Sequence, residues 1–173
     1  MSIAICPGSF DPITLGHLNI IRRTSRIFDR VVVCVMYNSS KTSPMFSVEE
    51  RLDMVKRVVS KYPNVTVDSS DGLLAEYARQ FEGAVVVKGL RAASDFEYEF
   101  QMNLINKKIN PEMETMFLTS SGKYTFLSSS VVREMARYDA DLEGFVPDEI
   151  IEDIREKAKQ WRMGRNGWQQ RRS

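Results

Sequence analysis

Five short runs rich in Val and Ile alternate with longer amphipathic stretches along this chain, and no other feature constrains the fold as strongly. The runs lie at Ile3–Cys6, Arg30–Met36, Val65–Val67, Ala84–Val87 and Thr115–Leu118. Short runs of this composition are typical of strands that are buried on both faces of a parallel sheet. Because parallel strands are joined by right-handed crossovers, usually helical, the pattern predicts an α/β fold. We expect a Rossmann-like, doubly wound five-stranded parallel sheet with helices on both faces.

The stretches between these runs have the apolar spacing of helices. The expected helices cover residues 48–59, 71–81, 94–109, 128–138 and 150–161. The helix over 48–59 has a clear start, because Ser47 and Glu50 have the spacing of a capping box. In parallel sheets of this kind ligands bind outside the carboxyl ends of the strands, so functional residues are expected directly after the strand-like runs.

The helix expected over Ser94–Ile109 has apolar residues on two sides. Tyr98, Met102, Ile105 and Ile109 form one stripe, and Phe96, Phe100 and Leu104 form the other. A helix that is apolar on two sides is normally buried on both. We therefore expect it to contact a second subunit as well as its own sheet. The alternative is a helix that is enclosed entirely by its own chain.

Composition and charge exclude several classes of protein. Of the 173 residues, 43% are hydrophobic and 27% charged, as in globular proteins, and the length predicts a single domain, placed at residues 1–161. The formal net charge is +1, so no overall field attracts nucleic acid or a membrane, and neither is an expected partner. No apolar run reaches the length of a membrane span, and the first residues lack the pattern of a signal peptide. A cytoplasmic protein is expected.

The segment 162–173 is basic, with four arginines and no acidic residue. We expect a flexible, solvated C-terminal tail there; the alternative is an arm that binds phosphate or a partner.

Cysteine and histidine are scarce, which narrows the possible chemistry. Cys6 and Cys34 lie in apolar runs and form no CxxC motif, so both are expected to be buried structural residues. His17 is the only histidine, so a zinc site of the usual Cys/His kind would lack ligands, and no protein-bound metal is expected. A Ser-His-Asp triad would also have to use His17.

Anion binding is indicated where the first strand-like run ends, in the sequence PGSFDPITLGH over residues 7–17. Gly8 permits a tight turn, and Thr14 can cap the helix that follows. The start of a helix offers free N–H groups and a partial positive charge, which together bind anions. His17, in the first turn, adds a directed hydrogen-bond donor at the same place.

The string Pro7–Pro12, followed by Thr14, Gly16 and His17, resembles the signature of the phosphopantetheine adenylyltransferases, bacterial enzymes of the nucleotidyltransferase superfamily. The superfamily pattern is HxGH, and this branch has threonine at the first position, as here. Three further segments resemble the family in the same order. They are Ser40–Phe46, Lys88–Arg91 with Asp95–Glu99, and Tyr124–Ser130 with Arg133. The resemblance spans nearly all of residues 1–160 and implies a nucleotidyltransferase domain.

The resemblance implies transfer of the adenylyl group of ATP to 4′-phosphopantetheine, which yields dephospho-coenzyme A and pyrophosphate. It implies catalytic roles for His17, as transition-state stabiliser, and for Lys41 and Arg91. The residues implied in binding phosphopantetheine are Ser9, Lys41, Leu74 and Lys88. The residues implied in binding ATP are Ser9, Phe10, His17, Gly89, Leu90, Arg91, Glu99, Tyr124, Thr125, Phe126, Leu127, Ser128, Ser129 and Ser130.

Mg²⁺ is implied as an ion carried with ATP, since no acidic cluster surrounds the motifs. The family also implies a homohexamer, in agreement with the two-sided helix over 94–109. One alternative is another nucleotidyltransferase, such as a nicotinamide mononucleotide adenylyltransferase or an enzyme with a CDP-linked product. Those relatives normally keep both histidines of HxGH and lack the Lys88–Arg91 segment. The other alternative is a non-catalytic adenine-nucleotide sensor, against which the intact His17, Lys41 and Arg91 argue.

Overall fold

The structure is a computed structural model that describes residues 1–37 and 44–169, with side chains described as far as residue 163. Its strands are β1 (Ile3–Gly8), β2 (Arg30–Met36), β3 (Val65–Ser70), β4 (Val85–Leu90) and β5 (Glu114–Thr119). Its α-helices are α1 (Leu15–Thr24), α2 (Val48–Val59), α3 (Leu74–Ala78), α4 (Ala93–Ile109), α5 (Ser129–Arg137) and α6 (Ile151–Gln169). Two short 3₁₀ helices, η1 (Gly122–Tyr124) and η2 (Asp148–Ile150), precede α5 and α6.

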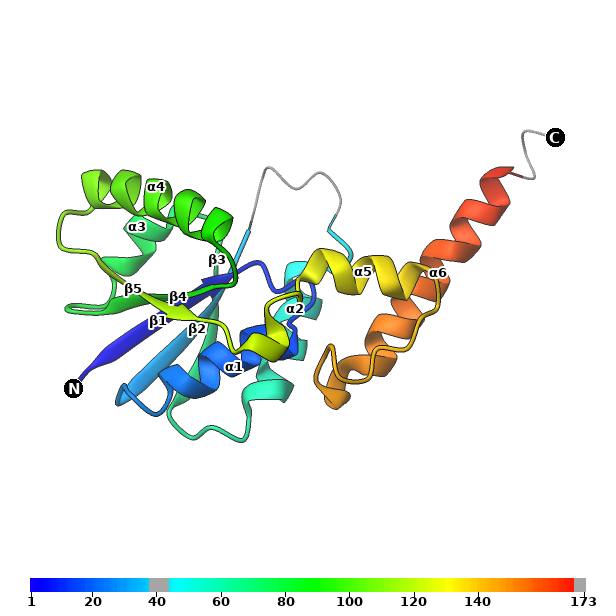
Figure 1. The fold of residues 1–173 in the computed structure, drawn as a ribbon, viewed down its shortest axis with the longest axis horizontal. Coiled ribbons are helices and arrows are strands. Elements are labelled where there is room, and N and C mark those ends of the chain that lie inside the picture. The colour runs from blue at the N-terminus through cyan, green and yellow to red at the C-terminus, as the bar shows by residue number, and fades with distance from the viewer. Residues whose placement is uncertain (38–43, 170–173) are drawn as a thin grey trace.

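The five strands form one parallel sheet in the order β3-β2-β1-β4-β5. The chain winds outward from β1 to β3, returns to the centre at β4, and then winds outward on the other side. This is a doubly wound sheet with its switch point between β1 and β4. Figure 1 shows α1 and α2 against one face and α3 and α4 against the other. The predicted fold class is therefore confirmed.

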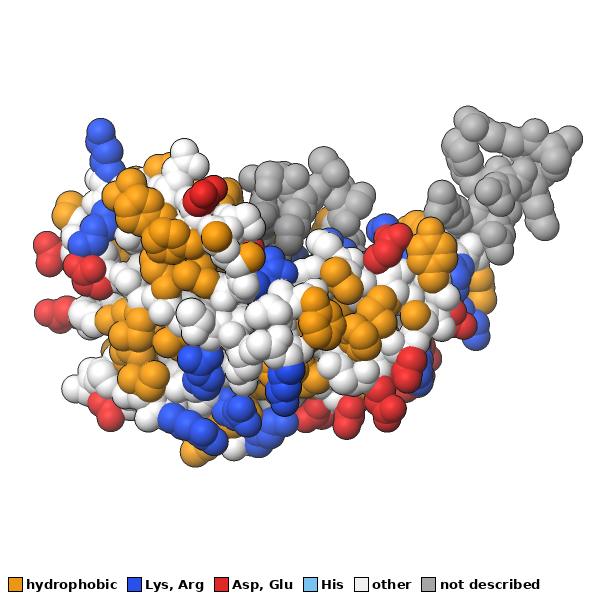
Figure 2. Space-filling view, in the orientation of Figure 1, with side chains coloured by type: hydrophobic (Ala, Val, Ile, Leu, Met, Phe, Trp, Pro, Cys, Tyr) orange, Lys and Arg blue, Asp and Glu red, His pale blue; other side chains and the backbone are white. Residues whose placement is uncertain are grey.

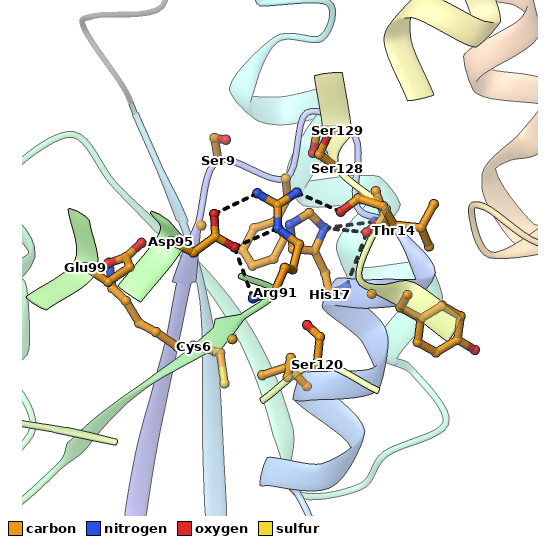
Figure 3. Close-up of a pocket in the computed structure, with 18 of the residues that line it drawn as sticks. Cys6, Ser9, Thr14, His17, Arg91, Asp95, Glu99, Ser120, Ser128 and Ser129 are labelled. Carbon is orange, nitrogen blue, oxygen red and sulfur yellow. Dashed lines mark hydrogen bonds and ion pairs between the residues drawn. The ribbon is translucent and has the colours of Figure 1, made fainter. Parts of the chain in front are cut away.

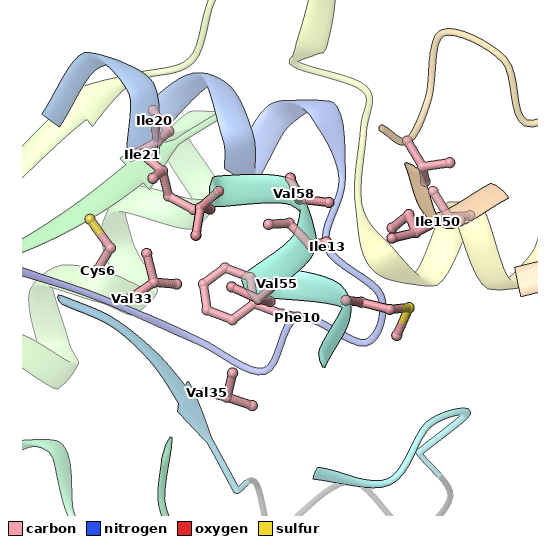
Figure 4. Packing of buried hydrophobic residues seen from close by; sticks show 14 of the residues in the cluster. Cys6, Phe10, Ile13, Ile20, Ile21, Val33, Val35, Val55, Val58 and Ile150 are labelled. Carbon is pink, nitrogen blue, oxygen red and sulfur yellow. The ribbon is translucent and has the colours of Figure 1, made fainter. Parts of the chain in front are cut away.

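Successive residues of the central strands enter two separate cores, one on each face of the sheet. Cys6 of β1 and Val33 of β2 are neighbours in register and face α1 and α2, where they pack in one cluster with Ile21 and Val55 (Figure 4). Ile5 faces the other way, into the cluster beneath α3. Burial on both faces explains why these strands are continuous apolar runs rather than alternating ones.

Helix α3 is shorter than predicted, covering 74–78 rather than 71–81. At its start, Ser70 Oγ accepts a hydrogen bond from the N–H of Gly72, and the N-cap Leu73 has no side-chain acceptor for the first turn. Beyond Ala78 the N–H groups of Arg79 and Phe81 bond three residues back instead of four. The ends of the predicted helix are therefore turns.

Helix α4 is not enclosed by its own chain. Residues from both predicted stripes are exposed: Phe96, Tyr98, Phe100, Leu104 and Ile105. Figure 2 shows the resulting apolar area over α4. The alternative that the chain itself covers both sides is wrong. Contact with a second subunit stays a prediction.

Helix α6 continues past residue 161 to Gln169, beyond the boundary expected for the tail. Arg162 explains part of this continuation, since its Nη1 donates to the carbonyl of Ala136 at 2.7 Å and its Nη2 donates to Asp139 Oδ1 at 3.1 Å. These bonds fix the helix against the end of α5. The division of the chain into domain and tail stays a prediction. Across the described part of the chain, no helix combines the length and apolar character that crossing a bilayer requires.

Candidate active site

A cavity of about 580 Å³ opens at the carboxyl ends of β1 and β4, between the starts of α1, α4 and α5 (Figure 3). It lies at the switch point of the sheet, where the fold predicts a ligand site. The predicted site residues that line it are Ser9, Phe10, His17, Lys88, Gly89, Arg91, Glu99, Tyr124, Leu127, Ser128, Ser129 and Ser130. Residues from four separate segments of the sequence therefore meet in one place.

Other predicted residues lie elsewhere. In the described structure Leu74, Leu90, Thr125 and Phe126 do not line this cavity. Leu74 is half-buried at the start of α3 and packs in the core beneath that helix. Phe126 is exposed, and its ring lies edge-on to Phe145. Lys41 lies outside the described residues, so its role stays a prediction.

The turn after β1 is built around Phe10, whose φ of 45° is unusual for a bulky residue. This conformation turns the ring inward, where it is buried. A Cβ on Gly8 would lie 2.9 Å from Cζ of that ring, so Gly8 must be a glycine for the ring to fit. The ring also meets the His17 imidazole edge-on, with centroids 5.2 Å apart. The buried ring of Phe10 thus packs against the imidazole of His17, the only histidine of the chain.

His17 is held by a reciprocal capping box at the start of α1. Thr14 is the N-cap, and its Oγ1 accepts a hydrogen bond from the backbone N–H of His17 at 3.3 Å. In return, Nδ1 of His17 accepts from the backbone N–H of Thr14 at 3.0 Å. Because Nδ1 accepts, the hydrogen-bond network assigns the proton of the neutral ring to Nε2. The imidazole is thus oriented as an Nε2–H donor in the wall of the cavity.

Both basic side chains at the end of β4 already have carboxylate partners. Lys88 Nζ lies 2.6 Å from Glu99 Oε2, and Arg91 forms a two-pronged pair with Asp95, at 2.9 Å from Nε and 3.1 Å from Nη2. Hydrogen bonds from Arg91 hold the pKa of Asp95 below its usual value. Neither cation therefore relies on a bound phosphate for an anionic partner. Instead, acidic residues of α4 orient them in the free protein.

The start of α5 brings a second helix N-terminus to the cavity. Ser128 caps the helix: its hydroxyl accepts a hydrogen bond from the N–H of Val131 at 3.1 Å. Ser129 Oγ donates to the carbonyl of Pro12 at 2.8 Å and so joins α5 to the β1–α1 turn. Arg91 Nη1 donates to the carbonyl of Leu127 at 2.8 Å. Two helix N-termini facing one cavity favour a polyanionic ligand.

Sequence analysis gave no role to Asp11, which the structure places at the centre of this assembly. Asp11 is buried, and its carboxylate accepts from the backbone N–H groups of Met45 at 3.1 Å and Phe46 at 2.9 Å. Arg133 Nη1 lies 3.5 Å from the same carboxylate. Asp11 thus connects the turn after β1 to the segment before α2 and to α5. Its signals in the sequence are that it is the only charged residue in the stretch 7–14 and that it belongs to the string Pro7–Pro12.

Within residues 1–37 and 44–163, no group of three or more His, Cys, Asp or Glu side chains is placed to hold a metal ion. Glu99 and Asp95, two acidic residues that line the cavity, are the partners of Lys88 and Arg91.

Comparisons with known proteins agree with this geometry. The chain matches the cytidylyltransferase-like family over residues 5–135. It is 52% identical over 159 residues to the phosphopantetheine adenylyltransferase of Caldanaerobacter subterraneus subsp. tengcongensis, which covers 92% of this chain and 99% of that protein. The enzyme of the same name from Clostridium tetani is 52% identical over 158 residues, 91% of this chain and 98% of that protein. The chain belongs to the phosphopantetheine adenylyltransferase family. It is therefore a nucleotidyltransferase, and the resemblance predicted from the motifs is confirmed.

A solved structure supports the fold of this adenylyltransferase family member. The protein is from Vibrio parahaemolyticus and is provisionally assigned as a nicotinate-nucleotide adenylyltransferase. The two share a TM-score of 0.64 at 20% identity, over 90% of this chain and 97% of the other. At that identity the likeness shows a common fold and no more.

Proposed function

We propose that the protein transfers the adenylyl group of ATP to 4′-phosphopantetheine, forming dephospho-coenzyme A and pyrophosphate. The observation that carries the proposal is identity above 50% with phosphopantetheine adenylyltransferases over more than nine-tenths of the chain. The gathering of motif residues in one cavity supports it.

The chemistry proposed for the cavity is a single displacement. An oxygen of the acceptor phosphate attacks the α-phosphorus of ATP, and the bond from that phosphorus to the pyrophosphate oxygen breaks. The acceptor is already an anion, so no strong base or covalent nucleophile is required. Catalysis then consists of bringing two polyanions into line and stabilising charge at the α-phosphorus. The helix starts at α1 and α5 and the two basic residues at the end of β4 suit both tasks.

His17 is the residue proposed to act on the reacting phosphorus. Its Nδ1 is used by the N–H of Thr14, so the Nε2–H is the donor that would bind an α-phosphate oxygen. We propose that this bond strengthens as negative charge develops in the transition state.

The remaining roles are divided between the two substrates. Arg91 and the serines at the start of α5 are proposed to bind the phosphates of ATP, with Gly89, Leu90, Glu99 and residues 124–127 around the nucleotide. Lys41, Lys88 and Ser9 are proposed to bind the acceptor phosphate, with Leu74 along the pantetheine arm. The positions of Lys88 and Arg91 support this division, since each cation lines the cavity and is held in place by a carboxylate.

Mg²⁺ is proposed to enter with ATP, where it would neutralise part of the charge of the phosphates. The pairing of Asp95 with Arg91 and of Glu99 with Lys88 supports this proposal, because these carboxylates already have cationic partners and ATP would be the main ligand of the ion. We further propose a homohexamer in the cytoplasm. The exposed apolar residues of α4 support an assembly, because a second copy would remove them from water.

Release of pyrophosphate from MgATP tests the function, with three acceptor conditions run in parallel. These are 4′-phosphopantetheine, nicotinamide mononucleotide, and glycerol 3-phosphate with CTP in place of ATP. We expect release with phosphopantetheine alone. Release only with nicotinamide mononucleotide or only with CTP would assign a different nucleotidyltransferase. Calorimetric binding of ATP with no release under any condition would support the sensor.

A further inference from the structure

A buried arginine beneath the turn after β1 takes part in no ion pair within the described structure. Arg51 of α2 is 3% exposed. Its Nη1 donates to the carbonyl of Ser9 at 2.9 Å, and its Nε donates to the carbonyl of Ser47 at 3.2 Å. No ion pair within residues 1–37 and 44–163 involves it. Burying a charge that makes no direct ion pair is costly, so Arg51 needs an explanation beyond packing.

The bond to Ser9 sets the direction of the next N–H group. The Ser9–Phe10 peptide is trans and planar, so its C=O and N–H point in opposite directions. The C=O points to Arg51 beneath the turn, and the N–H of Phe10 therefore points to the other side. Ser9 and Phe10 both line the cavity and Arg51 does not, so we infer that this other side is the cavity side. No acceptor for the N–H of Phe10 exists among the described residues.

A second arginine holds the carbonyl on the other side of Phe10. Arg133 Nη1 donates to the carbonyl of Asp11 at 2.6 Å. Phe10 thus lies between two carbonyls, each bound to a guanidinium group. A left-handed conformation of a bulky residue persists only where its surroundings fix it, and these bonds supply that restraint.

We propose that Arg51 is a positioning residue for the triphosphate of ATP. It fixes the Ser9–Phe10 peptide so that the N–H of Phe10 faces the cavity and binds a phosphate oxygen. Its buried charge adds positive potential beneath the same site. Arg51 itself does not touch the substrate. The identity of the ligand as a nucleotide phosphate rests on the proposed function.

The test compares three variants by calorimetric binding of MgATP and of inorganic pyrophosphate, without any acceptor. R51M removes the charge and both hydrogen bonds, whereas R51K keeps the charge and loses the fork geometry. R57M is the matched control, because Arg57 is on the same helix, binds Asp53 and Asp153, and does not line the cavity. We expect R51M to bind both ligands about 10- to 100-fold more weakly, R51K to fall between it and wild type, and R57M to bind normally.

A second measurement follows the N–H of Phe10 directly and covers the case in which R51M does not fold. Selective ¹⁵N labelling of the nine phenylalanines gives amide signals that can be followed as pyrophosphate is added. The Phe10 signal should shift in wild type and shift less in R51K. The proposal is overturned if R51M and R57M bind alike, if the Phe10 signal responds equally in R51K and wild type, or if wild type binds neither ligand. Failure of the proposed function is a separate outcome: nucleotide binding by wild type with no transfer to phosphopantetheine.

Discussion

Substitutions of His17 can separate the two hydrogen-bonding roles of its ring. Nδ1 accepts from the N–H of Thr14 at 3.0 Å and holds the start of α1, while Nε2–H is the proposed donor to the α-phosphate. Asparagine places an amide oxygen near the position of Nδ1 but does not reach that of Nε2. Glutamine carries an amide N–H to about the position of Nε2. H17N, H17Q and H17A therefore remove different parts of the same side chain.

The expected magnitudes follow from these two roles. Removing one preorganised donor from a reacting centre lowers kcat by about 10²- to 10³-fold, or ~2.7–4 kcal/mol of transition-state stabilisation. Leaving the buried N–H of Thr14 without an acceptor costs about 1–3 kcal/mol of folding free energy. We expect H17A to lower both kcat and the free energy of unfolding. H17N should lower mainly kcat, and H17Q should have a kcat between those of H17A and wild type.

The assay is pyrophosphate release at saturating MgATP and phosphopantetheine, with urea unfolding of each variant alongside. Separate titrations of the two substrates divide the effects between kcat and KM. Wild-type kcat in H17N would refute the role of Nε2–H. So would H17A with a normal kcat and only a raised KM for ATP, because that pattern means the contact is equally strong in the ground state.

Two further predictions concern the packing around the site. Gly89→Ala should lower the free energy of unfolding by about 1–3 kcal/mol, because the new Cβ would lie 2.8 Å from Cγ1 of Ile20. Gly122→Ala is the control and should have little effect, because nothing lies within 4 Å of its Cβ. Urea unfolding compares the two variants, and equal stabilities would contradict the packing around Gly89. Burial raises the pKa of Cys6 to about 12 and that of Cys34 to about 11, so both thiols should stay protonated at pH 8 and react with DTNB only after unfolding. Because the pKa values of the two thiols are higher in the folded protein than in an exposed thiol, keeping them protonated stabilises the fold. This stabilisation should be complete below about pH 8.5 and decline as the pH rises. Rapid labelling of either thiol in the native protein would contradict their burial.

Features set by neighbours in the sequence were predictable. The helix over 48–59 has the predicted bounds, because its apolar spacing and the capping box of Ser47 and Glu50 are local properties. The strands β1 to β5 were all found, since buried parallel strands have a distinctive composition. Thr14 was recognised as the cap of the helix that carries His17. The gathering of site residues at strand ends follows from the topology of such sheets.

Features that depend on contacts between distant segments were not predictable. Arg51 binds a carbonyl 42 residues away, and Arg133 binds one 122 residues away. Nothing local distinguishes Arg51 from a solvated arginine, and Arg133 was singled out only by its place in the family motif. The pairing of Arg91 with Asp95 was not predicted either, although the two residues are only four positions apart. The end of α6 was missed because it depends on the bond from Arg162 to Ala136.

The central claim is that the cavity catalyses one direct displacement, in which positioned donors and cations replace a covalent nucleophile. The stereochemical course at the α-phosphorus tests it most directly. ATP that carries a sulfur of known configuration on the α-phosphorus is converted with phosphopantetheine, and the configuration of the product is determined by ³¹P NMR. We predict inversion, the result of a single in-line attack by the acceptor phosphate. Retention would mean two displacements through an adenylylated side chain and would contradict the proposed mechanism.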